Sequence, residues 1–181
     1  ARLSKRHGAT SLLEYRNEGF LPEAVMNYLA RLGWAHGDQE IFSRQELIEK
    51  FDLPAVGRSP SVFDMDKLTW LNSHYLKTLP EDDIASRLLP FLEKIGIKTV
   101  HDTRLVRIVL NLRERAKTLK EMAQMSEYFF RDDHAVDDAA RAKFLTPAAK
   151  PILTDFADGL RDITSMDDEE SLKARLEGLT K

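Results

Sequence analysis

The sequence predicts a mostly α-helical protein, and three observations lead to this prediction. Apolar residues recur at spacings of three and four along most of the chain, while the alternation typical of strands is nearly absent. Capping sequences, prolines and glycines interrupt these periodic stretches at helical lengths. The 181 residues include no cysteine and no long apolar run, so we expect neither a disulfide framework nor membrane insertion, and a reducing cytoplasm fits.

The first expected helix covers about residues 21–32, with Pro22 near its start and Gly33 as a left-handed stop. Its apolar positions fall at helical spacing: Leu21, Ala24, Val25, Tyr28, Leu29 and Leu32. The sequence at 43–46 has the form of a capping box, which predicts that a second helix starts there and ends at 52–54.

A loop is expected at 57–60 because glycine and proline cluster there, and a helix follows over 66–75. This helix has one apolar side, and Trp70 and Tyr75 are expected to fill the core.

Proline and acidic residues at 80–83 predict the next helix start, because the helix macrodipole favours acids there, and the apolar pattern runs to Gly96. A domain boundary is expected near 77–80. The remaining helices are expected at about 103–115, 119–130, 137–144, 147–163 and 168–179.

The amino-terminal sequence is short and basic, with Arg2, Ser4 and Lys5 before His7 and Gly8. Such a short basic string is weak evidence by itself, but further stretches follow in the order and at the spacing of one protein family. Three stretches carry the likeness: 3–11, 21–34 and 63–72. Together they resemble bacterial glutamyl-tRNA synthetases, which are class I aminoacyl-tRNA synthetases.

The resemblance implies a division of the chain into an ATP-binding signature loop at 1–10, a helical stem-contact domain at 11–78 and a helical anticodon-binding domain at 79–181. It also implies that the amino-acid pocket lies upstream and that both ends belong to a longer enzyme. By resemblance, Lys5 would act as the catalytic cation on ATP, assisted by Arg2 and Ser4, because an ammonium stabilises charge that develops on phosphate oxygens. Magnesium is implied by ATP, but its ligands are not expected in this chain.

Charge is uneven although the formal net charge is only −3. Residues 94–120 hold eight lysines and arginines against two acids, which is typical of a phosphate-contacting surface or of a solvated helix face. The residues expected to contact tRNA are Arg107, Arg113, Arg115, Lys117 and Lys120.

Arg115 resembles the family position at which an arginine faces an anticodon base, and this would imply an enzyme that charges glutamate tRNA and avoids glutamine tRNA. The alternative is a helix-end arginine that pairs with Glu114 or Glu121.

Other constellations have plain structural interpretations. The five histidines show no paired spacing that would indicate a metal site. Aromatic residues at 128–130 suit either base stacking or core packing, and Phe129 continues the apolar face of the preceding helix.

The resemblance implies part of a monomeric glutamate–tRNA ligase, inactive by itself. The alternative is a freestanding helical RNA-binding or scaffolding module without catalytic activity.

Overall fold

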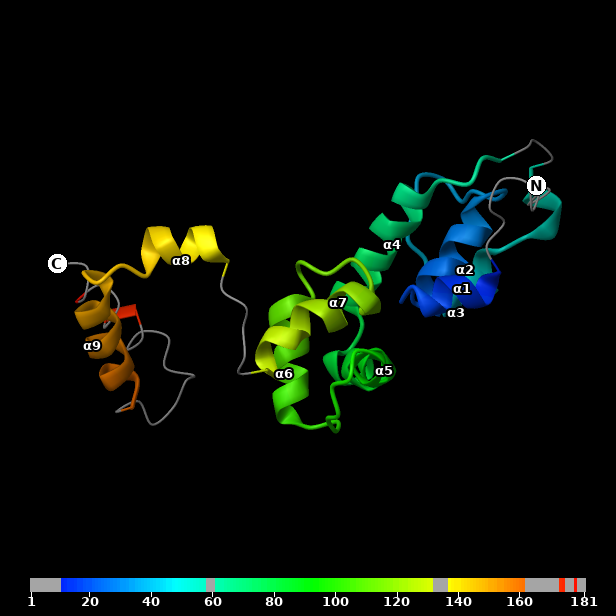
Figure 1. Cartoon of the computed structure of the whole chain (residues 1–181). Helices are drawn as coiled ribbons and strands as arrows, with labels where there is room; N and C mark the ends of the chain where they lie inside the picture. The colour runs from blue at the N-terminus through cyan, green and yellow to red at the C-terminus, as the bar shows by residue number, and fades with distance from the viewer. Residues whose placement is uncertain (1–10, 58–60, 132–136, 162–172, 175–177, 179–181) are drawn as a thin grey trace. The chain divides into compact units, whose positions relative to one another are not determined.

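The computed structural model describes residues 11–57, 61–131, 137–161, 173–174 and 178. Within these residues the regular secondary structure is helical, which confirms the predicted mostly α fold (Figure 1). The strand-like pairing in this part of the chain is limited to an isolated bridge between His36 and Gln39. None of the described helices has both the length and the apolar character needed to cross a bilayer.

The chain forms two compact units, Ala1–Asp132 and Asp133–Lys181. The first contains seven α-helices among its described residues: α1 Leu12–Asn17, α2 Pro22–Arg31, α3 Arg44–Lys50, α4 Met65–Thr78, α5 Glu81–Lys94, α6 Thr103–Leu112 and α7 Leu119–Ser126. Short 3-10 helices occupy Leu53–Ala55 and Glu127–Phe129. The second unit contains α8 Asp138–Phe144 and α9 Ala149–Arg161.

Local sequence signals set most of the helix ends. At the start of α3, the Glu46 amide donates to the Ser43 hydroxyl at 3.1 Å and the Ser43 amide donates to the Glu46 carboxylate at 2.8 Å, as the predicted capping box requires. Gly96, to which the apolar pattern was expected to run, follows α5 with φ +81°.

The main core of the first unit joins α2, α4, α5, α6 and α7. Helix α2 packs against α4, while α5 packs against both α6 and α7. Fully buried leucines at positions 21, 71, 76, 88 and 105 belong to one apolar cluster that runs through these helices. A smaller cluster of Trp34, Phe42 and Leu47 fills the space around α3.

Two predictions about side chains and turns were wrong. Trp70 is 48% exposed, because the buried stripe of α4 passes through the neighbouring positions 68, 71, 72 and 75 and leaves Trp70 on the outer face. Its indole lies under the Lys67 ammonium, 4.5 Å from the ring centroid.

Gly33 is not a left-handed stop, since the glycines with positive φ among the described residues are Gly19, Gly37 and Gly96. Gly33 instead permits close approach, because a Cβ there would lie 3.2 Å from Val56 Cγ1.

The predicted boundary near residues 77 to 80 coincides with the two-residue connection between α4 and α5. The proposed functional division at 78 remains a prediction. The predicted helix over 168–179 lies largely outside the described residues.

Candidate nucleic-acid interface

The candidate site is the stretch from Arg113 to Lys120, called here the 113–120 segment, which joins α6 to α7. Helix α6 starts with the Asp102 carboxylate accepting from the Leu105 amide at 2.8 Å and presents its apolar stripe to α5 and α7. It ends in a tight turn in which the Arg115 amide donates to the Leu112 carbonyl at 2.9 Å. The turn leads into Thr118, which is the N-cap of α7.

The amino-terminal end of α7 is capped from within the segment. The Glu121 amide donates to the Thr118 hydroxyl at 3.1 Å, and the Glu121 carboxylate accepts from the Lys117 amide at 2.8 Å. Ala116 and Leu119 are buried, while Arg115 and Lys117 are exposed. The segment therefore has a fixed backbone and presents its cationic side chains to solvent.

A wholly buried asparagine on α4 also holds this backbone. Asn72 accepts from the Leu21 amide at 2.7 Å and donates to the Lys117 carbonyl at 2.6 Å, so one side chain joins the start of α2 to the 113–120 segment. Both of its bonds reach residues more than forty positions away. Sequence analysis assigned no role to Asn72.

The turn between α1 and α2 supplies a second support. The Leu119 amide donates to the Gly19 carbonyl at 3.0 Å, and a Cβ on Gly19 would lie 2.4 Å from the Lys120 nitrogen. Beside this contact, the Lys120 ammonium pairs with the Glu18 carboxylate at 2.8 Å. Sequence analysis also missed Gly19, although a glycine between a short helix and the next apolar stretch is a turn signal.

The predicted tRNA-contacting residues differ in their surroundings. Arg107 is exposed on α6. Arg113 has 18% of its side chain exposed and lies 3.7 Å from the Glu81 carboxylate at the start of α5. Lys120 is half-exposed and paired with Glu18. The structure thus places Arg113 and Lys120 in ion pairs between elements.

Arg115 differs from these residues. The two acids considered as its partners are engaged elsewhere: Glu114 pairs with Lys77 at 2.9 Å, and Glu121 caps the Lys117 amide. Within the described part of the chain, no carboxylate forms an ion pair with Arg115 or with Lys117. Two cationic side chains are therefore available to an anionic partner at the turn.

The neighbouring aromatic residues divide between the two earlier interpretations. Phe129 and Phe130 pack against the main core, which confirms core packing for Phe129. Tyr128 is 68% exposed and lies edge-on to the Phe129 ring. The Arg104 guanidinium lies 5.2 Å from the Phe130 ring centroid.

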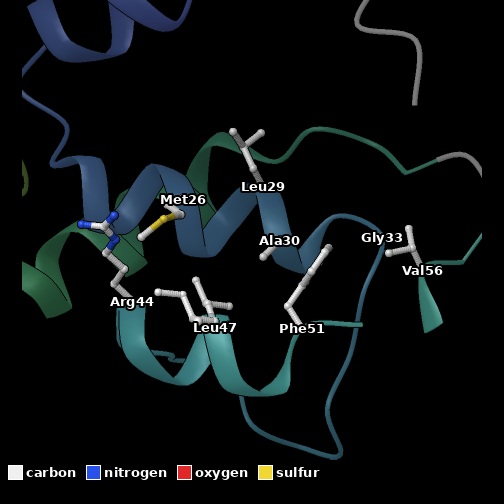
Figure 2. A pocket seen from close by; sticks show the side chains of 9 residues that line it. Met26, Leu29, Ala30, Gly33, Arg44, Leu47, Phe51 and Val56 are labelled. Atoms are coloured by element: carbon white, nitrogen blue, oxygen red, sulfur yellow. The ribbon is translucent and has the colours of Figure 1, made fainter. Parts of the chain in front are cut away.

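An apolar cavity of about 550 Å³ lies between α2 and α3 (Figure 2). Its walls include Met26, Leu29, Leu47 and Phe51, and among the described residues Arg44 is the one charged residue that lines it. In the part of the chain that the structure describes, no acid, nucleophile or histidine lines this cavity, so these walls supply no group for acid–base or covalent chemistry. The described residues also contain no cluster of three side chains suited to a metal ion.

The predicted ATP-contacting residues Arg2, Ser4 and Lys5 lie outside the described residues.

Comparison with known proteins gives two family matches. The catalytic-domain model of the class I tRNA synthetases for glutamate and glutamine matches residues 1–70, and the anticodon-binding domain model matches residues 83–181. The glutamate–tRNA ligase of Geobacter sulfurreducens is 50% identical over 159 residues, which cover 88% of this chain and 34% of that protein. Glutamate–tRNA ligase 1 of Syntrophus aciditrophicus is 52% identical over 160 residues, with the same coverage of 88% and 34%.

A solved structure has a similar fold. It is a glutamate tRNA ligase from Elizabethkingia meningosepticum in complex with its amino acid, with a TM-score of 0.81 and 26% identity over 99% of this chain and 39% of that chain. The chain thus spans about a third of the length of the curated relatives it matches. From the match over residues 83–181, which is more than half of its length, the chain belongs to the anticodon-binding domain family.

Proposed function

We propose that this chain is the tRNA-recognising part of a glutamate–tRNA ligase and that its 113–120 segment reads the anticodon. The exposed Arg115 carries this proposal, because it lies on a fixed turn within the region matched by the anticodon-binding family. A guanidinium can donate two parallel hydrogen bonds to a base edge or to a phosphate. Arg107, Arg113, Lys117 and Lys120 would add phosphate contacts.

In the ligase, glutamate would react with ATP to form an adenylate and pyrophosphate, and the acyl group would then pass to the tRNA. Lys5, with Arg2 and Ser4, would bind the phosphates and stabilise the charge that develops on them. Magnesium would accompany ATP. The match of residues 1–70 to the catalytic domain of this class supports the assignment of these residues to the enzyme.

The proposal includes three functional parts, namely an ATP loop at 1–10, a stem-contact domain at 11–78 and an anticodon-binding domain at 79–181. It treats the protein as a monomer in the cytoplasm, where translation takes place. The chain by itself would bind tRNA without charging it. A reading frame that continues upstream of Ala1 into a nucleotide-binding half supports the ligase, whereas a start codon directly before Ala1 supports the freestanding module.

The test of anticodon reading is the affinity of the chain for tRNA(Glu) and tRNA(Gln) transcripts. Arg115→Gln is expected to reduce the preference for tRNA(Glu) by about tenfold, because losing one bidentate base contact costs about 1–3 kcal/mol. Arg44→Gln is the matched control, since Arg44 is also exposed but lies on α3. An unchanged ratio in Arg115→Gln would remove Arg115 from base reading.

The proposed role of Lys5 has a separate test in the full ligase. Lys5→Ala is expected to slow adenylate formation by more than about tenfold, because a charge acting on the phosphates supplies at least 1.4 kcal/mol of transition-state stabilisation. Pyrophosphate exchange measures this step, and near-normal exchange would reject the role.

A further inference from the structure

We propose that Asn72 and Gly19 are positioning residues for anticodon recognition: they hold the 113–120 segment in register, and Arg115 acts through their support. This inference rests on the proposed function of Arg115. It extends that function to two residues from the part of the chain matched by the catalytic-domain family or immediately after it.

Asn72 holds the 113–120 segment through a hydrogen bond to its backbone. Its amide donates to the Lys117 carbonyl at 2.6 Å, two residues after Arg115, while its side-chain oxygen accepts from the Leu21 amide at 2.7 Å. The side chain is wholly buried, so no water replaces a bond that is lost. A bidentate contact tolerates displacements of only about 0.5 Å, and loss of this bond would therefore loosen the guanidinium.

Gly19 supports the 113–120 segment at the turn between α1 and α2. Its φ of +86° and its contact with the Leu119 and Lys120 amides leave no space for a Cβ. The Leu119 amide donates to the Gly19 carbonyl, so the first turn of α7 rests directly on this residue. Any side chain at position 19 would push α7, and the segment in front of it, away from the α1–α2 turn.

The chain offers a matched control for Asn72. Asn27 is also wholly buried, accepts from a backbone amide, that of Phe42, at 2.6 Å and donates to a backbone carbonyl, that of Glu40, at 2.9 Å. Asn27 therefore loses the same two kinds of backbone bond when it is replaced by alanine, together with a third bond from the Tyr75 hydroxyl at 3.0 Å, but it holds the loop before α3 and not the 113–120 segment.

The experiment compares the ratio of affinities for tRNA(Glu) and tRNA(Gln) in Asn72→Ala and Asn27→Ala. Both variants are expected to lower the melting temperature. Only Asn72→Ala should reduce the preference for tRNA(Glu), by about tenfold, which is the loss expected when one base contact is misplaced. In an Arg115→Gln background, Asn72→Ala should cause no further loss of preference, because residues that act as one unit are not additive. A purely structural role would not produce this coupling.

Gly19→Ala provides an independent test, with Gly96→Ala as its control. Gly96 has a similar φ of +81°, but nothing lies within 4 Å of its added Cβ. Both substitutions introduce backbone strain, and only Gly19→Ala should reduce the tRNA preference.

The outcomes separate the two proposals. Absence of any preference in the wild type, or an unchanged ratio in Arg115→Gln, would overturn base reading and the positioning role with it. A normal response to Arg115→Gln together with unchanged ratios in Asn72→Ala and Gly19→Ala would overturn the positioning role alone.

Discussion

The ion pair between Glu23 on α2 and Arg87 on α5 joins the helices of the two family matches, and removing it should measurably weaken the first unit. The guanidinium donates to both carboxylate oxygens at 2.8 and 3.0 Å, and each side chain is only about a quarter exposed, at 26% and 28%. A charge-assisted hydrogen bond contributes about 1.5–3 kcal/mol, and an exposed ion pair about 0.2–1 kcal/mol. We therefore expect a coupling free energy of about 1.5 kcal/mol.

A double-mutant cycle with Glu23→Ala and Arg87→Ala, followed by urea unfolding, measures this coupling. Arg87→Ala should lower the free energy of unfolding more than Glu23→Ala does. Arg87 also pairs with Asp83 at 2.6 Å, so its removal leaves both carboxylates without their cation. The exposed pair of Lys120 with Glu18 is the matched control and should couple by less than about 0.5 kcal/mol. Equal coupling in the two cycles would refute the reasoning.

The pH dependence of this pair has a defined sign. Burial raises the pKa of Glu23, but hydrogen bonds and charge from Arg87 outweigh burial, so the net pKa lies below the ordinary 4.5. The pair therefore stabilises the folded state above pH 4.5, and this contribution is lost as the pH falls through the lowered pKa. Glu23→Ala should flatten the stability profile in that acidic range.

Three further predictions concern side chains of the first unit. Tyr75→Phe should lower the free energy of unfolding in urea by about 1–2 kcal/mol, because the buried hydroxyl donates to the Phe42 carbonyl at 2.7 Å. Burial raises the pKa of Tyr75 to about 12, so the wild type should lose stability as the pH rises above 10, whereas the variant should keep it. Hydrogen bonding to the Ser43 amide lowers the pKa of Glu46 to about 2, and an NMR titration of its carboxyl that gives 4 or higher would contradict the capping geometry. Trp70→Ala should change stability by less than about 1 kcal/mol, since the indole is half-exposed, and a loss of more than 3 kcal/mol would show that it belongs to the core.

The helices could be predicted from the sequence because local interactions define their ends. A capping box at Ser43, acids after Pro80 and a glycine at position 96 each act within one turn of the helix end that they define. Trp70 was misplaced because the expected apolar side of α4 omitted a buried polar residue, Asn72, whose position shows which way the helix faces.

The residues that support the candidate site could not be predicted in this way. Asn72 meets Leu21 and Lys117 across separations of 51 and 45 residues, and Lys120 meets Glu18 across 102. Such pairings depend on tertiary packing and leave no periodic trace in a single sequence. Arg115 was singled out by its likeness to a family position, and the structure places it three residues after α6 ends at Leu112. Glu114 pairs with Lys77 and Glu121 caps the Lys117 amide, so neither neighbouring acid pairs with Arg115.

The most direct test of the account is a nuclease footprint of tRNA(Glu) bound to this chain, read at single-nucleotide resolution with wild type and with Arg115→Gln. The account predicts that the wild type protects the anticodon loop and that the variant loses protection at an anticodon base while keeping it along the stem. Protection confined to other parts of the tRNA, or an anticodon footprint unchanged by the substitution, would contradict it.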